Sequence, residues 1–155
     1  MLATKKVSAF AAVALTLLCT TPPAAPHEIK FGTLTIVHPW ARPMPDAPDV
    51  MAGYLKIINT GNEVDKLIRA TAEIALSSEF DEMNMDNGLM KASVVKGGIV
   101  IPAGKTVALT SKSLHIMFLR VKSQPMEGTE FKGTLTFEKA GTVNVDFEVA
   151  ERADH

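Results

Sequence analysis

Hydrophobic and polar residues alternate strictly near the end of the chain. From Phe131 to Phe137 the odd positions hold Phe, Gly or Leu, and the even positions hold Lys or Thr. From Val143 to Val149 the odd positions hold Val or Phe, and the even positions hold Asn, Asp or Glu. A repeat of two residues is typical of a β-strand with one buried face and one solvated face. These two segments therefore predict neighbouring antiparallel strands that pack on one side only.

Short segments of the same kind follow one another through the chain, separated by turn residues. The candidate strands are Thr33–Val37, Gly53–Asn59, Lys66–Thr71, Glu79–Met85, Leu89–Val95, Ile99–Ile101, Thr106–Thr110, Leu114–Val121, Phe131–Glu138 and Thr142–Val149. We expect Ala72–Ser78 to form a short helical turn, and Pro39–Asp49, which contains four prolines, to form an irregular loop. The pattern as a whole predicts an all-β fold, an antiparallel β-sandwich without a long helix.

The first 26 residues have the features of an export signal. Two lysines precede an apolar run from Val7 to Leu18, and small residues and prolines follow the run. The run is shorter than the ~20 residues that a membrane-spanning helix needs. We therefore expect residues 1–26 to be a cleaved signal peptide, and residues 27–155 to form one domain that is soluble in the periplasm and does not insert into the membrane.

Cysteine content and charge exclude several classes of function. Cys19 is the only cysteine, and Leu18 stands where a small residue normally precedes a lipidated Cys, so we expect no lipid there. Cleavage after Cys19 leaves no thiol, which excludes zinc–thiolate sites, thiol redox centres and blue-copper centres. The net charge of −1 at pH 7 argues against a nucleic-acid partner. Any metal must then bind through His, Met, carboxylate or backbone groups.

The pair His115 and Met117 is the first candidate for metal chemistry. Strand alternation places both on one face, opposite Leu114, Ile116 and Phe118. A thioether is a soft, uncharged donor that favours Cu(I), and an imidazole adds affinity without imposing one geometry. Taken alone, the pair is explained more simply as a packing Met beside an ordinary half-exposed His.

A group of three methionines upstream favours the interpretation of His115 and Met117 as part of a copper site. Met83 and Met85 share a strand face, and the turn at Asp86-Asn87-Gly88 folds Met90 back beside them. Three thioethers then meet at one end of a hairpin. The alternative is a Met-lined hydrophobic patch without a metal.

Other residues suggest a different metal site, but none suggests an ordinary active site. If the mature chain began at His27, its α-amine and ring could chelate Cu(II), and His38 could complete a histidine brace. Pro26 disfavours signal-peptidase cleavage at that bond. The sequence contains no acid/base pair in a recognisable setting, no nucleophile elbow and no phosphate-binding glycine loop, so we expect no enzyme.

Several motifs together resemble one known family. They are His38-Pro39-Trp40-Ala41-Arg42-Pro43, Ala52-Gly53-Tyr54-Leu55, Glu82-Met83-Asn84-Met85, Ile101-Pro102-Ala103-Gly104, His115-Ile116-Met117 and Leu135-Thr136-Phe137-Glu138. From about Gly32 to Val149 the chain resembles the periplasmic copper chaperones of the PCuAC family. The resemblance implies a Greek-key, cupredoxin-like β-sandwich that delivers Cu(I) towards the copper centres of cytochrome c oxidase. The implied partner is a copper-accepting protein, either periplasmic or membrane-anchored.

The family's ligand pattern is only half present. It consists of a His, a Met about ten residues later, and His-x-Met about twenty-one residues after that, a soft set suited to Cu(I). His115 and Met117 match the second half, whereas Asp81 and Ala92 occupy the positions of the first His and Met. Three outcomes stay open. In the first, Cu(I) binds through His115 and Met117 with one or two of the three upstream methionines. In the second, Cu(II) binds through harder donors such as Asp81 or an N-terminal histidine brace, and a brace would also suit a copper oxidase. In the third, the domain binds no metal and acts as an interaction module.

Overall fold

Residues 27–151 of the chain are described by a computed structural model, and within them the chain forms β-strands and no helix. The strands are β1 (Glu28–Phe31), β2 (Leu34–Met44), β3 (Ala47–Asn59), β4 (Asp65–Ala72), β5 (Ala75–Asp86), β6 (Leu89–Val94), β7 (Ile99–Ile101), β8 (Thr106–Leu109), β9 (Leu114–Val121), β10 (Glu130–Phe137) and β11 (Gly141–Val149). The predicted all-β class is confirmed. The expected signal segment and Cys19 lie outside the described residues.

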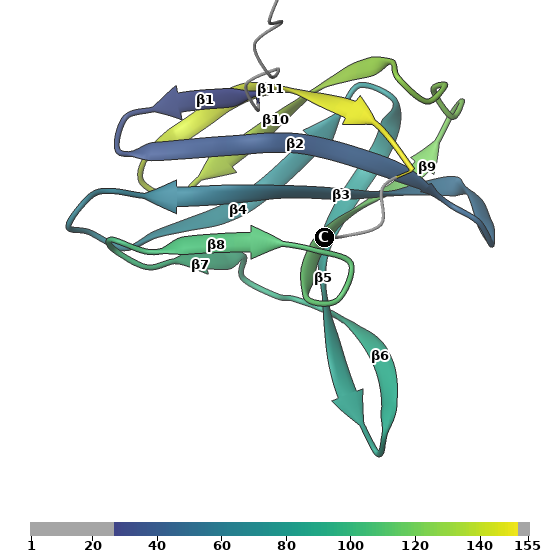
Figure 1. Ribbon diagram of the computed structural model, residues 1–155, viewed down its shortest axis with the longest axis horizontal. Coiled ribbons are helices and arrows are strands. Elements are labelled where there is room, and N and C mark those ends of the chain that lie inside the picture. The colour runs from purple at the N-terminus through teal and green to yellow at the C-terminus, as the bar shows by residue number, and fades with distance from the viewer. Residues whose placement is uncertain (1–26, 152–155) are drawn as a thin grey trace, which may run out of the picture.

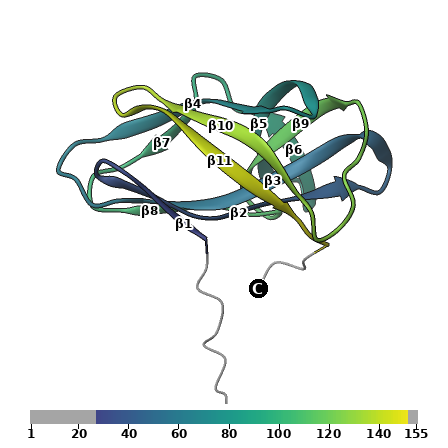
Figure 2. The ribbon, with the colours of Figure 1, turned by 90° about the horizontal axis from the view of Figure 1, so that it is seen from above.

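The eleven strands form one sheet that curls on itself. Its order is β6-β5-β9-β3-β2-β11-β10-β4-β7, with β1 paired to β2 and β8 paired to β3. The described pairs are antiparallel except β2 with β11, which run parallel. In Figure 2, β4, β7 and β10 lie above β2, β3 and β8, so the two halves of the sheet form the layers of a sandwich. The sandwich is confirmed, with one parallel pair that the residue pattern does not reveal.

The core between the layers uses the apolar positions that the alternation predicts. Phe118, Phe131 and Phe147 are at most 2% exposed. The rings of Phe131 and Phe147 stack with centroids 5.3 Å apart, and the ring of Phe118 stands edge-on to both. Gly133 occupies an inward position of β10 because a Cβ there would collide with the carbonyl of Thr71 and the ring of Phe147. Three aromatic rings from three strands thus fix how the layers pack.

The predicted loop at Pro39–Asp49 is wrong. β2 continues to Met44, and β3 begins at Ala47 after a two-residue turn. Pro39 and Pro43 fall at the two shifts in the β2–β3 register. A proline has no N–H to give to a ladder, and a register irregularity is where a strand tolerates that loss. Prolines that indicated a loop therefore mark bulges in a long hairpin.

The predicted helical turn at Ala72–Ser78 is also wrong. β4 continues to Ala72, and β5 begins at Ala75 after a two-residue turn. The short strand β1 was not predicted. It exists because it pairs with β2 over four residues, a contact that local sequence cannot indicate.

The β5–β6 hairpin projects from the sandwich (Figure 1). Asn87 and Gly88, with φ of 50° and 80°, form its two-residue turn, as positive φ at both positions requires in a type I′ turn. Every residue of β6 is exposed. We call residues 83–94 the hairpin arm. Because β9 begins at Leu114, it supports the base of this arm and not its end.

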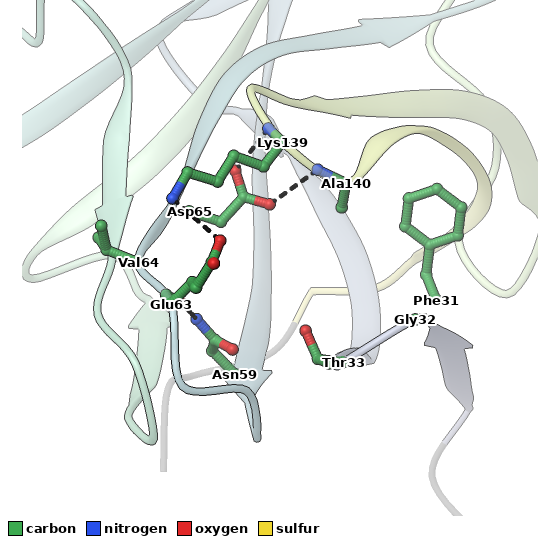
Figure 3. Close-up of a pocket in the computed structure, with 9 residues that line it drawn as sticks. All are labelled: Phe31, Gly32, Thr33, Asn59, Glu63, Val64, Asp65, Lys139 and Ala140. Carbon is green, nitrogen blue, oxygen red and sulfur yellow. Dashed lines mark hydrogen bonds and ion pairs between the residues drawn. The ribbon is translucent and has the colours of Figure 1, made fainter.

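Two buried polar side chains, Asp65 and Asn59, stabilise the structure around the pocket drawn in Figure 3. The Asp65 carboxylate accepts hydrogen bonds from the backbone N–H groups of Lys66, Lys139 and Ala140 at 2.7 to 3.0 Å. The Asn59 amide donates to two backbone carbonyls and accepts from one N–H. The Asp65 contacts join β4 to the β10–β11 turn, and the Asn59 amide contacts β7 at Ile101, beside a pocket of about 380 Å³. Since each buried polar atom there has a partner, the pair serves the fold.

Candidate metal centre

His115 and Met117 lie on the face of β9 that points away from the main core. Ile116 and Phe118, which alternate with them, are fully buried between the layers. His115 is nevertheless only 7% exposed, and Met117 is half-buried against a second, smaller apolar cluster. The predicted division of β9 into a core face and an opposite face that carries His115 and Met117 is therefore confirmed, whereas metal binding by that opposite face, which we call the donor face, stays a prediction.

One hydrogen bond sets which nitrogen of His115 is available. The ring Nδ1 lies 3.0 Å from the backbone carbonyl of Ser113. A carbonyl only accepts, so Nδ1 carries the proton and donates it, which leaves the lone pair on Nε2. A backbone carbonyl on the distal nitrogen is the usual way that proteins orient a metal-binding His. The same Ser113 carbonyl accepts the backbone N–H of Met83 at 3.2 Å, which ties β5 to the start of β9.

Asp81 lies directly opposite His115 in the β5–β9 ladder. Residues opposed in this way have side chains on one face, with Cβ atoms about 5 Å apart. Asp81 is 9% exposed, and its Oδ1 is buried with no hydrogen-bond partner among the described residues. Sequence reasoning named Asp81 only as a possible harder donor. Its pairing with His115 depends on a ladder between strands more than thirty residues apart, which local pattern does not show.

The three upstream methionines occupy two different places. Met83 is half-buried, two residues along β5 from Asp81 and on the same face, and it pairs with Ala92. Met85 and Met90 pair with each other further along the arm and are 67% and 46% exposed. At about 3.3 Å per residue, Met83 lies about 7 Å and Met85 about 13 Å along the strand from Asp81. The structure therefore groups Met83 with Asp81 and His115, and it sets the Met85–Met90 pair apart on the arm.

An aromatic pair forms the inner boundary of this group. The rings of Trp40 and Tyr54 lie 4.5 Å apart between centroids, and the Tyr54 ring lies 6.3 Å from that of His115. Arg42 Nε donates to the Tyr54 hydroxyl at 3.2 Å. Met117 and Met44 pack against this aromatic cluster. The sequence alone did not place either ring beside the site, although Trp40 and Tyr54 belong to motifs that carry the family resemblance.

Comparison with known proteins identifies the family. A sequence model of the LpqE-like family, described as "Putative lipoprotein LpqE-like", matches residues 34–149. The chain belongs to the LpqE-like family. A putative lipoprotein of Leifsonia xyli subsp. xyli, Lxx21020, is 30% identical to it over 100 residues, or 64% of this chain. The chain spans only 60% of that relative's length.

Solved structures of PCuAC domains share the fold of this LpqE-like chain. The apo PCuAC domain from PmoF1 is 26% identical with a TM-score of 0.68, and the match covers 81% of this chain and all of that domain. The copper-bound PCuAC domain from PmoF2 is 24% identical with a TM-score of 0.67, covering 81% and 99%. The Cu(I) form of DR1885 from Deinococcus radiodurans is 21% identical with a TM-score of 0.61, covering 82% and 83%. The expected PCuAC-type, cupredoxin-like fold is therefore confirmed.

The histidines near the start of the domain lie in a different setting. The His38 N–H donates to the His27 carbonyl at 2.7 Å, and His38 Nε2 lies 3.7 Å from a carboxylate oxygen of Glu148. Among residues 27–151 no three His, Cys, Asp or Glu side chains form a group that could hold a metal ion. A Cu(II) brace at His27 stays a prediction.

The same part of this LpqE-like chain contains no helix long and apolar enough to cross a membrane.

Proposed function

We propose that this LpqE-like protein is an exported copper carrier that binds Cu(I) and passes it to copper sites outside the cytoplasm, such as those of cytochrome c oxidase. The observation that carries the proposal is the donor face of β9. It presents a His115 nitrogen with its lone pair available beside the Met117 thioether. An imidazole with thioethers is a donor set that Cu(I) prefers. The copper-bound PCuAC domain from PmoF2 and the Cu(I) form of DR1885 support copper as the bound metal.

In this proposal His115 and Met117 are the primary ligands, and Met83 is the nearest further thioether. Met83 approaches from β5 on the same face as His115 and is held by the Ser113 carbonyl that also orients the ring. Met85 and Met90 are exposed on the arm, where an incoming partner reaches them first. We assign them the role of outer thioethers that exchange copper with the partner. Exposed thioethers next to a partly buried site suit a carrier, because an acceptor can displace one neutral donor at a time.

Export is part of the proposal. The lipoprotein descriptions of the family and of the Leifsonia relative support it. They also run against our expectation that Cys19 carries no lipid, so the protein works either free in the periplasm or anchored to a membrane by its N-terminus. The partner in both cases is a copper-accepting protein, and no catalytic step is required of the carrier.

A Cu(I) competition titration of the purified exported protein tests the proposal. We expect one Cu(I) per chain, and we expect Met117→Ala to weaken binding about tenfold because it removes one of two primary donors. Met126→Ala is the matched control, since Met126 is 76% exposed and outside the donor face, and it should bind as the parent does. If the parent takes up no Cu(I), the protein is not a Cu(I) carrier, and if it takes up no Cu(II) either, the metal-free interaction module is favoured.

A further inference from the structure

The buried polar side chains of the described residues fall into two pairs. They are Asn59, Asp65, Asp81 and His115. The first two lie beside the pocket of Figure 3, and the last two face each other across β5 and β9. One pair fastens the sandwich, and the other lies in the candidate metal centre.

The two buried carboxylates differ in how they are satisfied. Asp65 accepts three backbone N–H groups. Asp81 has a buried Oδ1 without a partner, and it takes part in none of the ion pairs found between residues 27 and 151. An uncompensated buried carboxylate opposes folding, and proteins keep such groups mainly where they have a function. One oxygen of the Asp81 carboxylate, Oδ1, is therefore buried without a hydrogen-bond donor.

We propose that Asp81 is a metal ligand and that it enables the site of His115 and Met117 to hold divalent copper as well as Cu(I). This inference rests on the proposed function. The carboxylate oxygen of Asp81 and Nε2 of His115 come from directly opposed residues on one face, so a metal ion between the strands can contact both. Met117 and Met83 lie on either side of this pair along the strands.

The chemistry of a carboxylate explains why Asp81 would increase the affinity of the site for Cu(II) relative to Cu(I). Cu(II) favours nitrogen and oxygen donors, whereas Cu(I) favours thioether and imidazole donors. Asp81 also brings a negative charge to a nearly buried position, and its attraction for a divalent ion is twice that for a monovalent ion at the same distance. At the position where the resemblance places a neutral His, this chain has an anionic oxygen. The proposed ligand set thus combines a hard donor, the carboxylate of Asp81, with the imidazole of His115 and a soft donor, the thioether of Met117.

Parallel titrations with Cu(II) and Cu(I) test the inference on the exported protein. Trp40 is the only tryptophan and lies in the aromatic cluster beside His115, so its fluorescence reports binding. We expect Asp81→Asn to lower the Cu(II) affinity at least tenfold and to change the Cu(I) affinity less than about threefold. Asp81→His should raise the ratio of Cu(I) to Cu(II) affinity. Asp86→Asn, on the same strand and paired with Lys91, is the matched control and should change neither.

The outcomes separate this inference from the proposed function. If the parent binds Cu(I) and Asp81→Asn binds Cu(II) as tightly as the parent does, Asp81 is not a ligand and Cu(I) carriage stands. If the parent binds Cu(II) through Asp81 but takes up no Cu(I), Asp81 is a Cu(II) ligand, but Cu(I) carriage fails and so does the claim that one site holds both ions. If the parent binds neither ion, both fail.

Urea unfolding of the metal-free protein gives a second, independent readout. Because Asp81 Oδ1 is buried without a hydrogen-bond partner, Asp81→Asn breaks no hydrogen bond at that atom, and we expect it to leave the unfolding midpoint unchanged or to raise it. We expect Asp65→Asn to lower the midpoint, since it weakens three hydrogen bonds to a charged acceptor. A midpoint that falls equally in both variants would show that Asp81 serves the fold, and would overturn the inference.

Discussion

His115→Ala is expected to weaken Cu(I) binding about a hundredfold or more. The substitution removes the only imidazole on the donor face of β9, whose Nε2 lone pair is made available by the hydrogen bond to Ser113. The thioethers that remain are weaker donors, and changes to groups that merely orient a ligand already cost 10- to 100-fold in metal affinity. A hundredfold loss corresponds to about 2.7 kcal/mol of binding free energy. Competition with a Cu(I) chelator of known affinity measures it.

The control for this prediction is His38→Ala. His38 lies beside Glu148 and the His27 carbonyl, so its loss should change the Cu(I) affinity less than about twofold. Circular dichroism of both variants checks that the β-sandwich is retained. Equal affinity of His115→Ala and the parent would remove His115 from the site. A large loss with His38→Ala would move the site towards the start of the domain.

Phe147→Ala is expected to have the largest effect on stability. Phe147 is fully buried on β11, and its ring contacts those of Phe131 and Phe118 with both centroid distances at 5.3 Å. Truncation of a buried Phe leaves a cavity and costs about 3 to 5 kcal/mol, which is a large part of the 5 to 15 kcal/mol typical of a domain. Phe147→Leu keeps most of the volume and should cost about 1.5 kcal/mol or less. Urea unfolding followed by far-UV circular dichroism measures both.

A small loss with Phe147→Ala would contradict the packing described for the two layers. A loss with Phe147→Leu as large as with Phe147→Ala would mean that ring shape matters more than filled volume.

Strands with one buried and one solvated face were predictable from sequence, because apolar and polar residues alternate along them. This is why β10 and β11 have almost the predicted bounds. Pro39 and Pro43 misled the prediction because a proline excludes a regular ladder but not a bulge, and only the partner strand decides which occurs. The parallel pairing of β2 with β11 and the strand β1 likewise depend on distant contacts.

For the candidate site too, local features were predictable from sequence and contacts between distant strands were not. Alternation along β9 placed His115 and Met117 together, because both lie on one strand. The arrangement of the hairpin was predicted through its turn, and Met90 does face Met85. Whether those thioethers reach His115 depends on where β9 begins, which no local pattern states. The opposition of Asp81 and His115 depends on a long-range register, and the unsatisfied oxygen of Asp81 appears only in three dimensions.

X-ray absorption spectroscopy of the Cu(I)-loaded exported protein tests the central claim most directly, because it identifies the atoms bound to copper. The account predicts nitrogen from one imidazole together with thioether sulfur. It further predicts that the imidazole signal disappears in His115→Ala and that the sulfur contribution falls in Met117→Ala. A copper ion with no sulfur neighbour, or a spectrum that neither substitution changes, would contradict the claim that the donor face of β9 holds the metal.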